Sequence, residues 1–87
     1  MGWGMTVEDI EEKLVREVAI ILGTDSSTVD PTDPLHSMGV DSMSFVEILV
    51  FIEKAFNLKL IESGLGQEDF RTIRSLARRI SKEQAGA

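Results

Sequence analysis

Apolar residues recur at helical spacing in three segments of this 87-residue chain, and this pattern most narrows the folds it can adopt. Such spacing is typical of amphipathic helices that bury one face. The three segments cover about residues 6–22, 42–56 and 72–80, and no segment has a convincing strand pattern. The sequence therefore predicts an all-α fold, a small helical bundle with three main helices.

Local signals mark the ends of the first helix and the loop that follows it. Thr6 is placed to cap the helix N-terminus, and Gly23 is placed to cap its C-terminus. Residues 24–41 contain Pro31 and Pro34, each of which pushes the preceding residue out of the helical region. We therefore predict a long loop between the first two helices, packed down by its own apolar side chains.

The length of the chain limits it to one domain, which we expect to cover residues 6–81. Residues 1–5 have two glycines and no periodicity, so we expect a flexible leader, and we expect residues 82–87 to form a flexible tail. The segment Ile61–Phe70 also has two glycines, and we predict a short additional helix within it. A domain of this size is too small for a catalytic cleft together with a large core.

The net charge of the chain limits the classes of partner that it can bind. A net charge of −6 argues against nucleic acid, which needs a basic footprint, and favours partners with basic patches. Residues 71–87 depart from this balance, with five basic side chains and one acidic side chain. Such a run is usually a solvated face, and a docking patch is the alternative.

The amino-acid composition also indicates the cellular compartment in which the protein is expected. The chain has no cysteine, so it has neither disulfides nor thiolate metal sites, and we expect no metal site in it. No apolar run is longer than the five residues of Ile48–Ile52, far short of the roughly 20 that span a bilayer. With no signal-peptide pattern, we expect a cytoplasmic monomer that does not contact membranes.

The junction between the long loop and the second helix carries the strongest functional signal. Residues 39–43 read GVDSM and place Ser42 in the first turn of an apolar helix. A helix N-terminus has unpaired N–H groups and a partial positive charge, which suit a phosphate. Ser42 is therefore a good site for an ester-linked phosphate group. The alternatives are that Ser42 is an ordinary N-cap, or that Ser44 and Glu47 form a capping box.

Three stretches together resemble the acyl and peptidyl carrier protein family: DPL at 33–35, GVDSM at 39–43 and VEIL at 46–49. In that family the serine of a G-x-D-S-[LM] segment carries a 4′-phosphopantetheine arm, whose thiol holds acyl or peptidyl groups as thioesters. The resemblance covers roughly residues 6–80 and implies that Ser42 is the attachment site. It also implies that Asp41 is the acid that phosphopantetheinyl transferases recognise, together with a divalent metal held by the transferase and coenzyme A.

The resemblance implies a carrier that catalyses nothing itself. It would present acyl intermediates to loading, elongating or modifying enzymes. Members that serve fatty-acid synthesis commonly have an acidic residue where the neutral Ser44 stands, and acidic residues around the position of the positive Lys54. These differences favour a specialised fatty-acid or polyketide-type pathway. A peptidyl or aminoacyl carrier is the alternative within this class. An arm-less helical interaction domain is the alternative from another class, and a hydrolase built on Ser42 and His36 lacks the signs of an oxyanion hole or pocket.

A mixed apolar and charged stripe on the second helix begins beside Ser42. Met43, Glu47, Val50 and Lys54 recur at i, i+4, i+7 and i+11. We expect these residues, with Glu53, to dock partner enzymes, because an enzyme that acts on the arm must bind around its root. The alternative is that the stripe is solvated surface.

The opposite face of this helix should pack into the core. Its large side chains raise the question of whether the bundle interior can shelter cargo. Candidates to line such a space are Phe45, Phe51, Ile52 and Leu60. The same side chains could instead fill the interior and exclude a long chain.

Overall fold

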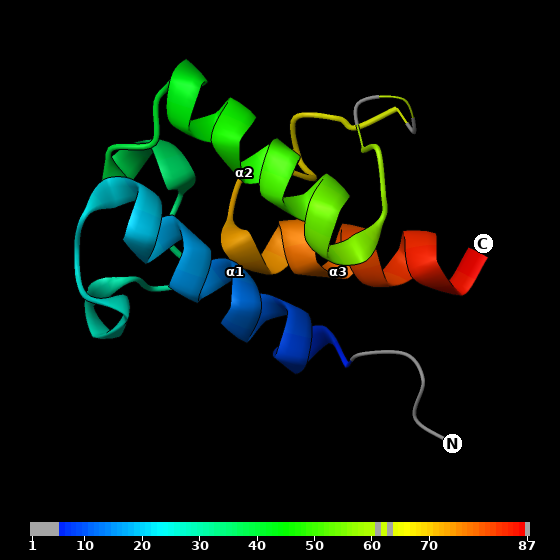
Figure 1. Cartoon of the computed structure of the whole chain (residues 1–87), viewed down its shortest axis with the longest axis horizontal. Coiled ribbons are helices and arrows are strands. Elements are labelled where there is room, and N and C mark those ends of the chain that lie inside the picture. The colour runs from blue at the N-terminus through cyan, green and yellow to red at the C-terminus, as the bar shows by residue number, and fades with distance from the viewer. Residues whose placement is uncertain (1–5, 61, 63, 87) are drawn as a thin grey trace.

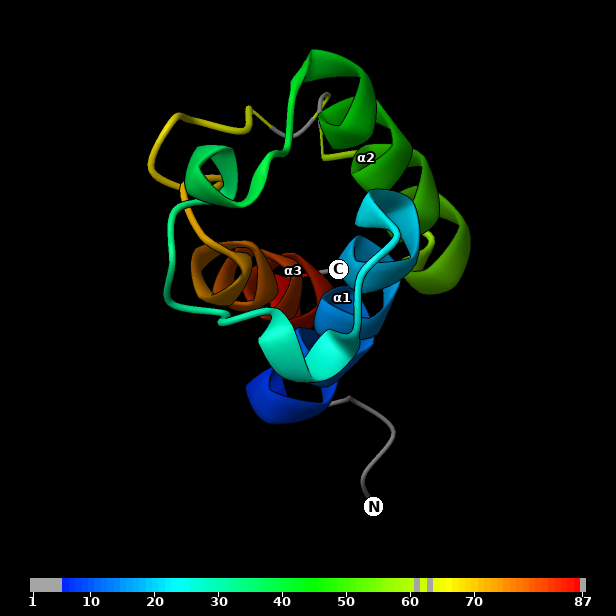
Figure 2. The ribbon, with the colours of Figure 1, turned by 90° about the vertical axis from the view of Figure 1, so that its left-hand side faces the viewer.

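The computed structural model describes residues 6–60, 62 and 64–86, in which helices are joined by loops and turns. It contains α1 (Val7–Leu22), η1 (Ser26–Thr28), η2 (Leu35–Met38), α2 (Ser42–Phe56) and α3 (Ile73–Gly86), where η marks a short 3₁₀-helix. Figures 1 and 2 show α1 and α3 side by side, and α2 lies across them and packs mainly against α1. The predicted all-α bundle with a long loop after the first helix is confirmed.

The ends of α1 form as their sequence predicts. The Thr6 hydroxyl accepts the N–H of Asp9 at 3.1 Å, and the Asp9 carboxylate accepts the N–H of Thr6 at 3.4 Å. These two hydrogen bonds satisfy two backbone N–H groups that otherwise have no partner at the start of a helix. At the other end Gly23 adopts a left-handed φ of 70°, and its N–H donates to the Ile20 carbonyl at 3.2 Å. Both predicted caps are confirmed.

The core lies where the three helices meet. Its buried side chains are all apolar, and no buried polar or charged residue is found in the described part of the chain. The most deeply buried members are Ile10, Leu14, Val18, Ile48, Ile52, Ile73, Leu76 and Ile80, each no more than 1 % exposed. These side chains form one hydrophobic core that α1, α2 and α3 share.

The long loop is fastened to the start of α3. The N–H of Leu35 donates to the Arg71 carbonyl at 2.9 Å, and the N–H of Arg74 donates to the Pro31 carbonyl at 3.0 Å. Val29 and Leu35 are buried, as expected for a loop held by its own apolar residues. The two 3₁₀-helices were not predicted from the sequence. In η1 the Asp25 carboxylate accepts the N–H of Ser27 and caps the start of this short turn.

Turns stand where the short additional helix was predicted. Among the described residues of this segment, 62 and 64–70, the structure has no helix. Gly64 has a left-handed φ of 78°, and the Asp69 carboxylate accepts the N–H of Gly66 at 2.9 Å. A left-handed residue and a side chain that captures a backbone N–H both compete with helical hydrogen bonding. The expected short helix is therefore wrong for the residues that can be described.

α3 begins near Thr72, as predicted, but ends later than predicted. Thr72 and Ser75 cap it reciprocally, each hydroxyl accepting the other residue's N–H at 3.0 Å. The helix then continues to Gly86, through most of the segment expected to be a tail. The predicted leader, residues 1–5, lies outside the described residues. No described helix combines the length and the apolar character needed to span a bilayer.

Candidate functional site

Ser42 is the first residue of α2 and is exposed to solvent. The cap position before it belongs to Asp41, whose carboxylate accepts the N–H of Ser44 at 2.8 Å. The interpretation of Ser42 as the cap is therefore wrong, and so is the capping box that starts at Ser44. Among the described residues the Ser42 hydroxyl has no hydrogen-bond partner, so it is free at a helix N-terminus that favours a phosphate.

Asp41 is held as an anion at this helix end. The N–H of Ser44, and then its hydroxyl, lower the pKa of the Asp41 carboxyl from its ordinary value. Its negative charge stabilises the first turn of the helix. The carboxylate is also exposed and therefore remains accessible to a partner. The site thus has a free hydroxyl directly beside a fixed negative charge.

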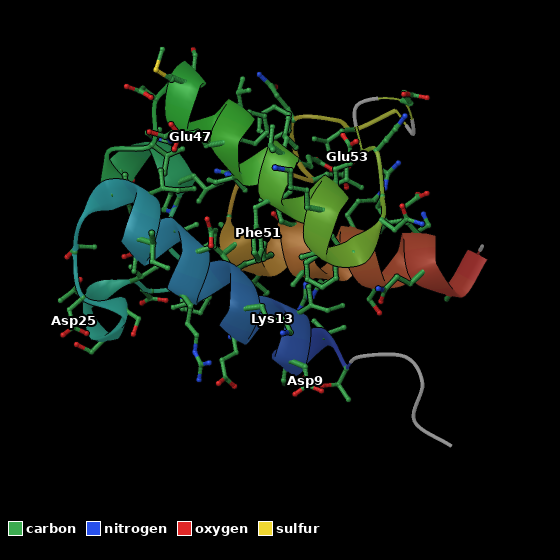
Figure 3. The ribbon with its side chains drawn as sticks, in the orientation of Figure 1. Asp9, Lys13, Asp25, Glu47, Phe51 and Glu53 are labelled. Carbon is green, nitrogen blue, oxygen red and sulfur yellow. The ribbon has the colours of Figure 1, made fainter. Side chains whose placement is uncertain are left out.

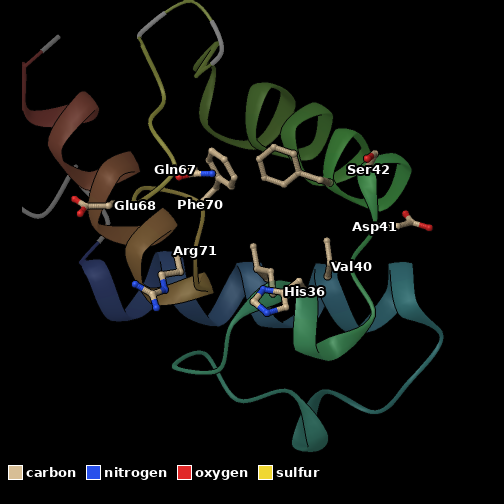
Figure 4. A pocket seen from close by; sticks show the side chains of 10 residues that line it. His36, Val40, Asp41, Ser42, Gln67, Glu68, Phe70 and Arg71 are labelled. Carbon is tan, nitrogen blue, oxygen red and sulfur yellow. The ribbon is translucent and has the colours of Figure 1, made fainter.

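A cleft opens beside Ser42, between the start of α2, η2 and the turn at 67–71 (Figure 4). We call it the Ser42 cleft, and its volume is about 730 Å³. It is lined by Leu35, His36, Val40, Asp41, Ser42, Phe45, Gln67, Glu68, Phe70 and Arg71. A space of this size is typical of small-molecule sites.

Two aromatic rings form one wall of the Ser42 cleft. The ring centroids of Phe45 and Phe70 lie 4.9 Å apart at an interplanar angle of 45°. We call Phe45 and Phe70 the ring pair. Of the four residues predicted to line a cargo space, only Phe45 reaches this cleft. Ile52 and Leu60 are buried in the core, and Phe51 packs edge-on against Phe56 with centroids 6.2 Å apart.

His36 lies on η2 and lines the same cleft as Ser42, with Val40 drawn between them in Figure 4. Within the described part of the chain, no hydrogen bond joins the His36 and Ser42 side chains. A serine nucleophile needs a base within hydrogen-bond reach and an orienting group behind that base. The arrangement therefore does not build a hydrolase.

The residues predicted to dock partners are all exposed on α2, and Figure 3 labels Glu47 and Glu53 among them. Met43 is 74 % exposed and Val50 is 46 % exposed. The sequence analysis missed Val46, which is 55 % exposed and completes an apolar row with them. Its position three residues after Met43 and four before Val50 is the signal that could have found it. We call Met43, Val46 and Val50 the outer row.

The arginines near the C-terminus divide into two kinds. Arg74 donates to the Glu11 carboxylate at 2.9 Å, which joins α3 to α1 and raises the pKa of Arg74. Arg79 binds Asp69 at 2.7 Å and Glu83 at 3.0 Å. Arg71 and Arg78 are exposed, and the described residues supply no ion pair to either. Two of the four arginines therefore stabilise the fold, which the charge count alone could not show.

Comparison with known proteins agrees with this geometry. The family model described as "Phosphopantetheine attachment site" matches residues 12–80. A D-alanyl carrier protein of Streptococcus suis is 31% identical over 68 residues, covering 78% of this chain and 86% of the relative. An acyl carrier protein of Syntrophobacter fumaroxidans is 27% identical over 82 residues, covering 93% of this chain and 99% of the relative.

A third relative, aminoacyl carrier protein 2 of Bradyrhizobium diazoefficiens, is 27% identical over 77 residues, covering 86% of each chain. The family match spans most of the sequence and includes the segment around Ser42. The chain therefore belongs to the phosphopantetheine-attachment family of carrier proteins, which hold their cargo on a covalent 4′-phosphopantetheine and are not themselves enzymes.

Proposed function

We propose that Ser42 carries the phosphopantetheine arm. The observation that supports this best is the free, exposed hydroxyl at the N-terminus of α2, next to a cleft of about 730 Å³. The resulting phosphodiester is an anion, which the helix end stabilises. The arm supplies a terminal thiol on which cargo is held as a thioester.

Attachment uses coenzyme A and a phosphopantetheinyl transferase. A bond forms between the Ser42 Oγ and the phosphorus on the pantetheine side of the pyrophosphate, and the bond to the adenosine 3′,5′-bisphosphate half breaks. The hydroxyl proton passes to a base of the transferase, because no basic group of this chain hydrogen-bonds to Ser42 among the described residues. We propose that Asp41, fixed as an anion beside the hydroxyl, is recognised by the transferase.

We propose that partner enzymes dock on the outer face of α2. The outer row provides apolar contact, and the exposed side chains of Glu47, Glu53 and Lys54 provide charge around it. Small apolar contacts surrounded by charge suit weak, exchangeable complexes, which a carrier visiting several enzymes needs. The partners are the transferase and the enzymes that load, elongate or modify the cargo, all in the cytoplasm.

Two kinds of cargo, both held as thioesters, are candidates for this carrier. An acyl group of a specialised fatty-acid or polyketide-type pathway is supported by the acyl carrier relative, which aligns over nearly its whole length. An aminoacyl group is supported by the D-alanyl and aminoacyl carrier relatives. Both are thioesters on the same arm, so the role proposed for Ser42 is common to them.

Incubation of the purified chain with coenzyme A and a promiscuous phosphopantetheinyl transferase tests the proposal. Intact-protein mass spectrometry should show a gain of one phosphopantetheine. A known carrier protein treated in parallel is the control. If that control is modified and this chain is not, the chain is an arm-less interaction domain and the proposal fails.

A further inference from the structure

The Ser42 cleft ends at the ring pair. Phe45 and Phe70 form one wall of it, and among its described lining residues only Leu35 belongs to the buried core. The next residue on the same face of α2 is Ile48, three positions after Phe45, and Phe70 packs, partly buried, against the core to which Ile48 and Ile73 belong. Both are almost fully buried, at 1 % and 0 % exposed. The cleft therefore stops one layer outside the packed interior.

The turn that carries Phe70 is fastened to α3. The Arg79 guanidinium binds the Asp69 carboxylate at 2.7 Å, and the Ser75 hydroxyl donates to the Asp69 carbonyl at 3.1 Å. The side chain of Arg79 is only 14 % exposed, so solvent screens this ion pair less than a surface pair. On the other side of Phe70, the Arg71 carbonyl accepts the N–H of Leu35. Phe70 is thus held between two anchors, against Phe45.

Entry of an alkyl chain into the bundle would have to separate the ring pair and displace close-packed side chains behind it. Burial of an alkyl chain is favourable, but an overfilled core loses packing and forces side chains out of their rotamers. The Ser42 cleft itself is open to the arm and needs no rearrangement to receive a short group.

We propose that the ring pair bars the cargo from the bundle interior, so that this carrier serves short acyl or aminoacyl groups, which stay in or outside the Ser42 cleft. Phe45 and Phe70 are the specificity-determining residues, and Arg79 is a positioning residue that acts through Asp69 and Phe70. The inference rests on the proposed attachment at Ser42 and deepens it by naming the class of cargo.

The test loads the full chain with butyryl or decanoyl groups, using the transferase and the corresponding acyl-coenzyme A. Two quantities are measured: the backbone amide chemical shifts, and the rate at which the thioester hydrolyses, followed by intact mass. In the wild-type chain both cargoes should shift only amides around the cleft, such as those of Val40 and Phe70. The decanoyl thioester should hydrolyse within about twofold of decanoyl-pantetheine free in solution, because it gains no shelter.

Phe70→Ala should open the barrier. Decanoyl cargo should then shift the amides of Ile48, Ile52 and Leu76, and its hydrolysis should slow by roughly tenfold, as for a group that is buried about nine-tenths of the time. Phe51→Ala is the matched control, because it removes a ring from the other aromatic contact of α2 and should leave decanoyl outside. If Phe70→Ala does not fold, Phe70→Leu replaces it.

The positioning role has its own pair of variants. Arg79→Gln should move decanoyl hydrolysis toward the Phe70→Ala rate, while Arg74→Gln, which breaks the ion pair to Glu11, should not. Shifts of core amides in decanoyl-loaded wild type, or equal effects of Phe70→Ala and Phe51→Ala, would overturn the inference. Absence of any loading would instead contradict the proposed function, so the two failures are distinguishable.

Discussion

The contact between α1 and α3 and the outer face of α2 use similar residues in opposite ways. Between α1 and α3 the apolar side chains of Leu14 and Ile73 are fully buried, and the charges of Glu11 and Arg74 are paired. On the outer face of α2 the outer row is exposed, and among the described residues Glu47 and Lys54 form no ion pair. The first region holds the fold, while the second is left available for partners.

This difference teaches where the free energy of folding and the free energy of binding reside. Residues that stabilise the bundle are shielded from partners, and residues that face partners contribute little to stability. The outer face of α2 can therefore specify partners without unfolding the carrier. Substitutions in the two regions should separate stability from transfer.

The largest expected effect is on stability in the core. Leu14→Ala should lower the free energy of unfolding by about 2–5 kcal/mol, because it leaves a cavity in a fully buried site. Val50→Ala on the outer row should change it by less than about 0.5 kcal/mol. Urea unfolding followed by circular dichroism measures both. A loss for Val50→Ala that equals the loss for Leu14→Ala would show that the outer row is structural.

An intermediate effect is expected on transfer. If Glu47 contacts a positively charged surface of the transferase, Glu47→Lys should slow arm attachment several-fold. That factor corresponds to roughly 1 kcal/mol, which is typical of an exposed charge contact. The urea midpoint should stay unchanged, and the effect should shrink as salt is raised. Glu12→Lys on α1 is the control, since it reverses an exposed charge away from α2. It also breaks the surface ion pair between Glu12 and Arg16 at 2.7 Å, which contributes at most about 1 kcal/mol to stability. Equal slowing by both variants would mean that net charge, not the α2 face, guides docking.

These regions also differed in how far the sequence could describe them. The helices, the Thr6 and Gly23 caps and the core face of α2 follow from local spacing and local hydrogen bonds, so they were predictable. The ring pair joins residues 25 positions apart along the chain, and the Arg79–Asp69 pair joins a helix to a turn. Such contacts depend on tertiary packing, which periodicity does not report.

The candidate site was predictable in part for the same reason. Ser42 and Asp41 stand in a local motif at a helix start, and the structure places both at that start. The Ser42 cleft needs η2 and the turn at 67–71, which the long-range bonds between residues 31–35 and 71–74 hold together. Gln67 and Phe70 therefore could not be assigned to the site from sequence.

The smallest expected effect is a pH dependence of stability at the α2 N-terminus. The N–H of Ser44 lowers the pKa of Asp41, so the folded pKa lies below the unfolded pKa. The stabilisation is therefore fully present above the ordinary value of 3.8 and is lost as the pH falls through the lowered value. Asp41→Asn keeps a capping side chain but removes this titration. The difference in urea midpoint between wild type and this variant should shrink as the pH falls below 3.8, and a difference that is constant with pH would contradict it.

The central claim is that Ser42, exposed beside the α2 cap, is where the arm is attached. Intact mass after treatment with coenzyme A and transferase tests it directly when Ser42→Ala is compared with Ser44→Ala. Ser44 lies in the same helical turn, and the 2.8 Å bond to Asp41 comes from its backbone N–H, which Ser44→Ala keeps. The account predicts one added phosphopantetheine in wild type and in Ser44→Ala, and none in Ser42→Ala. Modification of folded Ser42→Ala would contradict it.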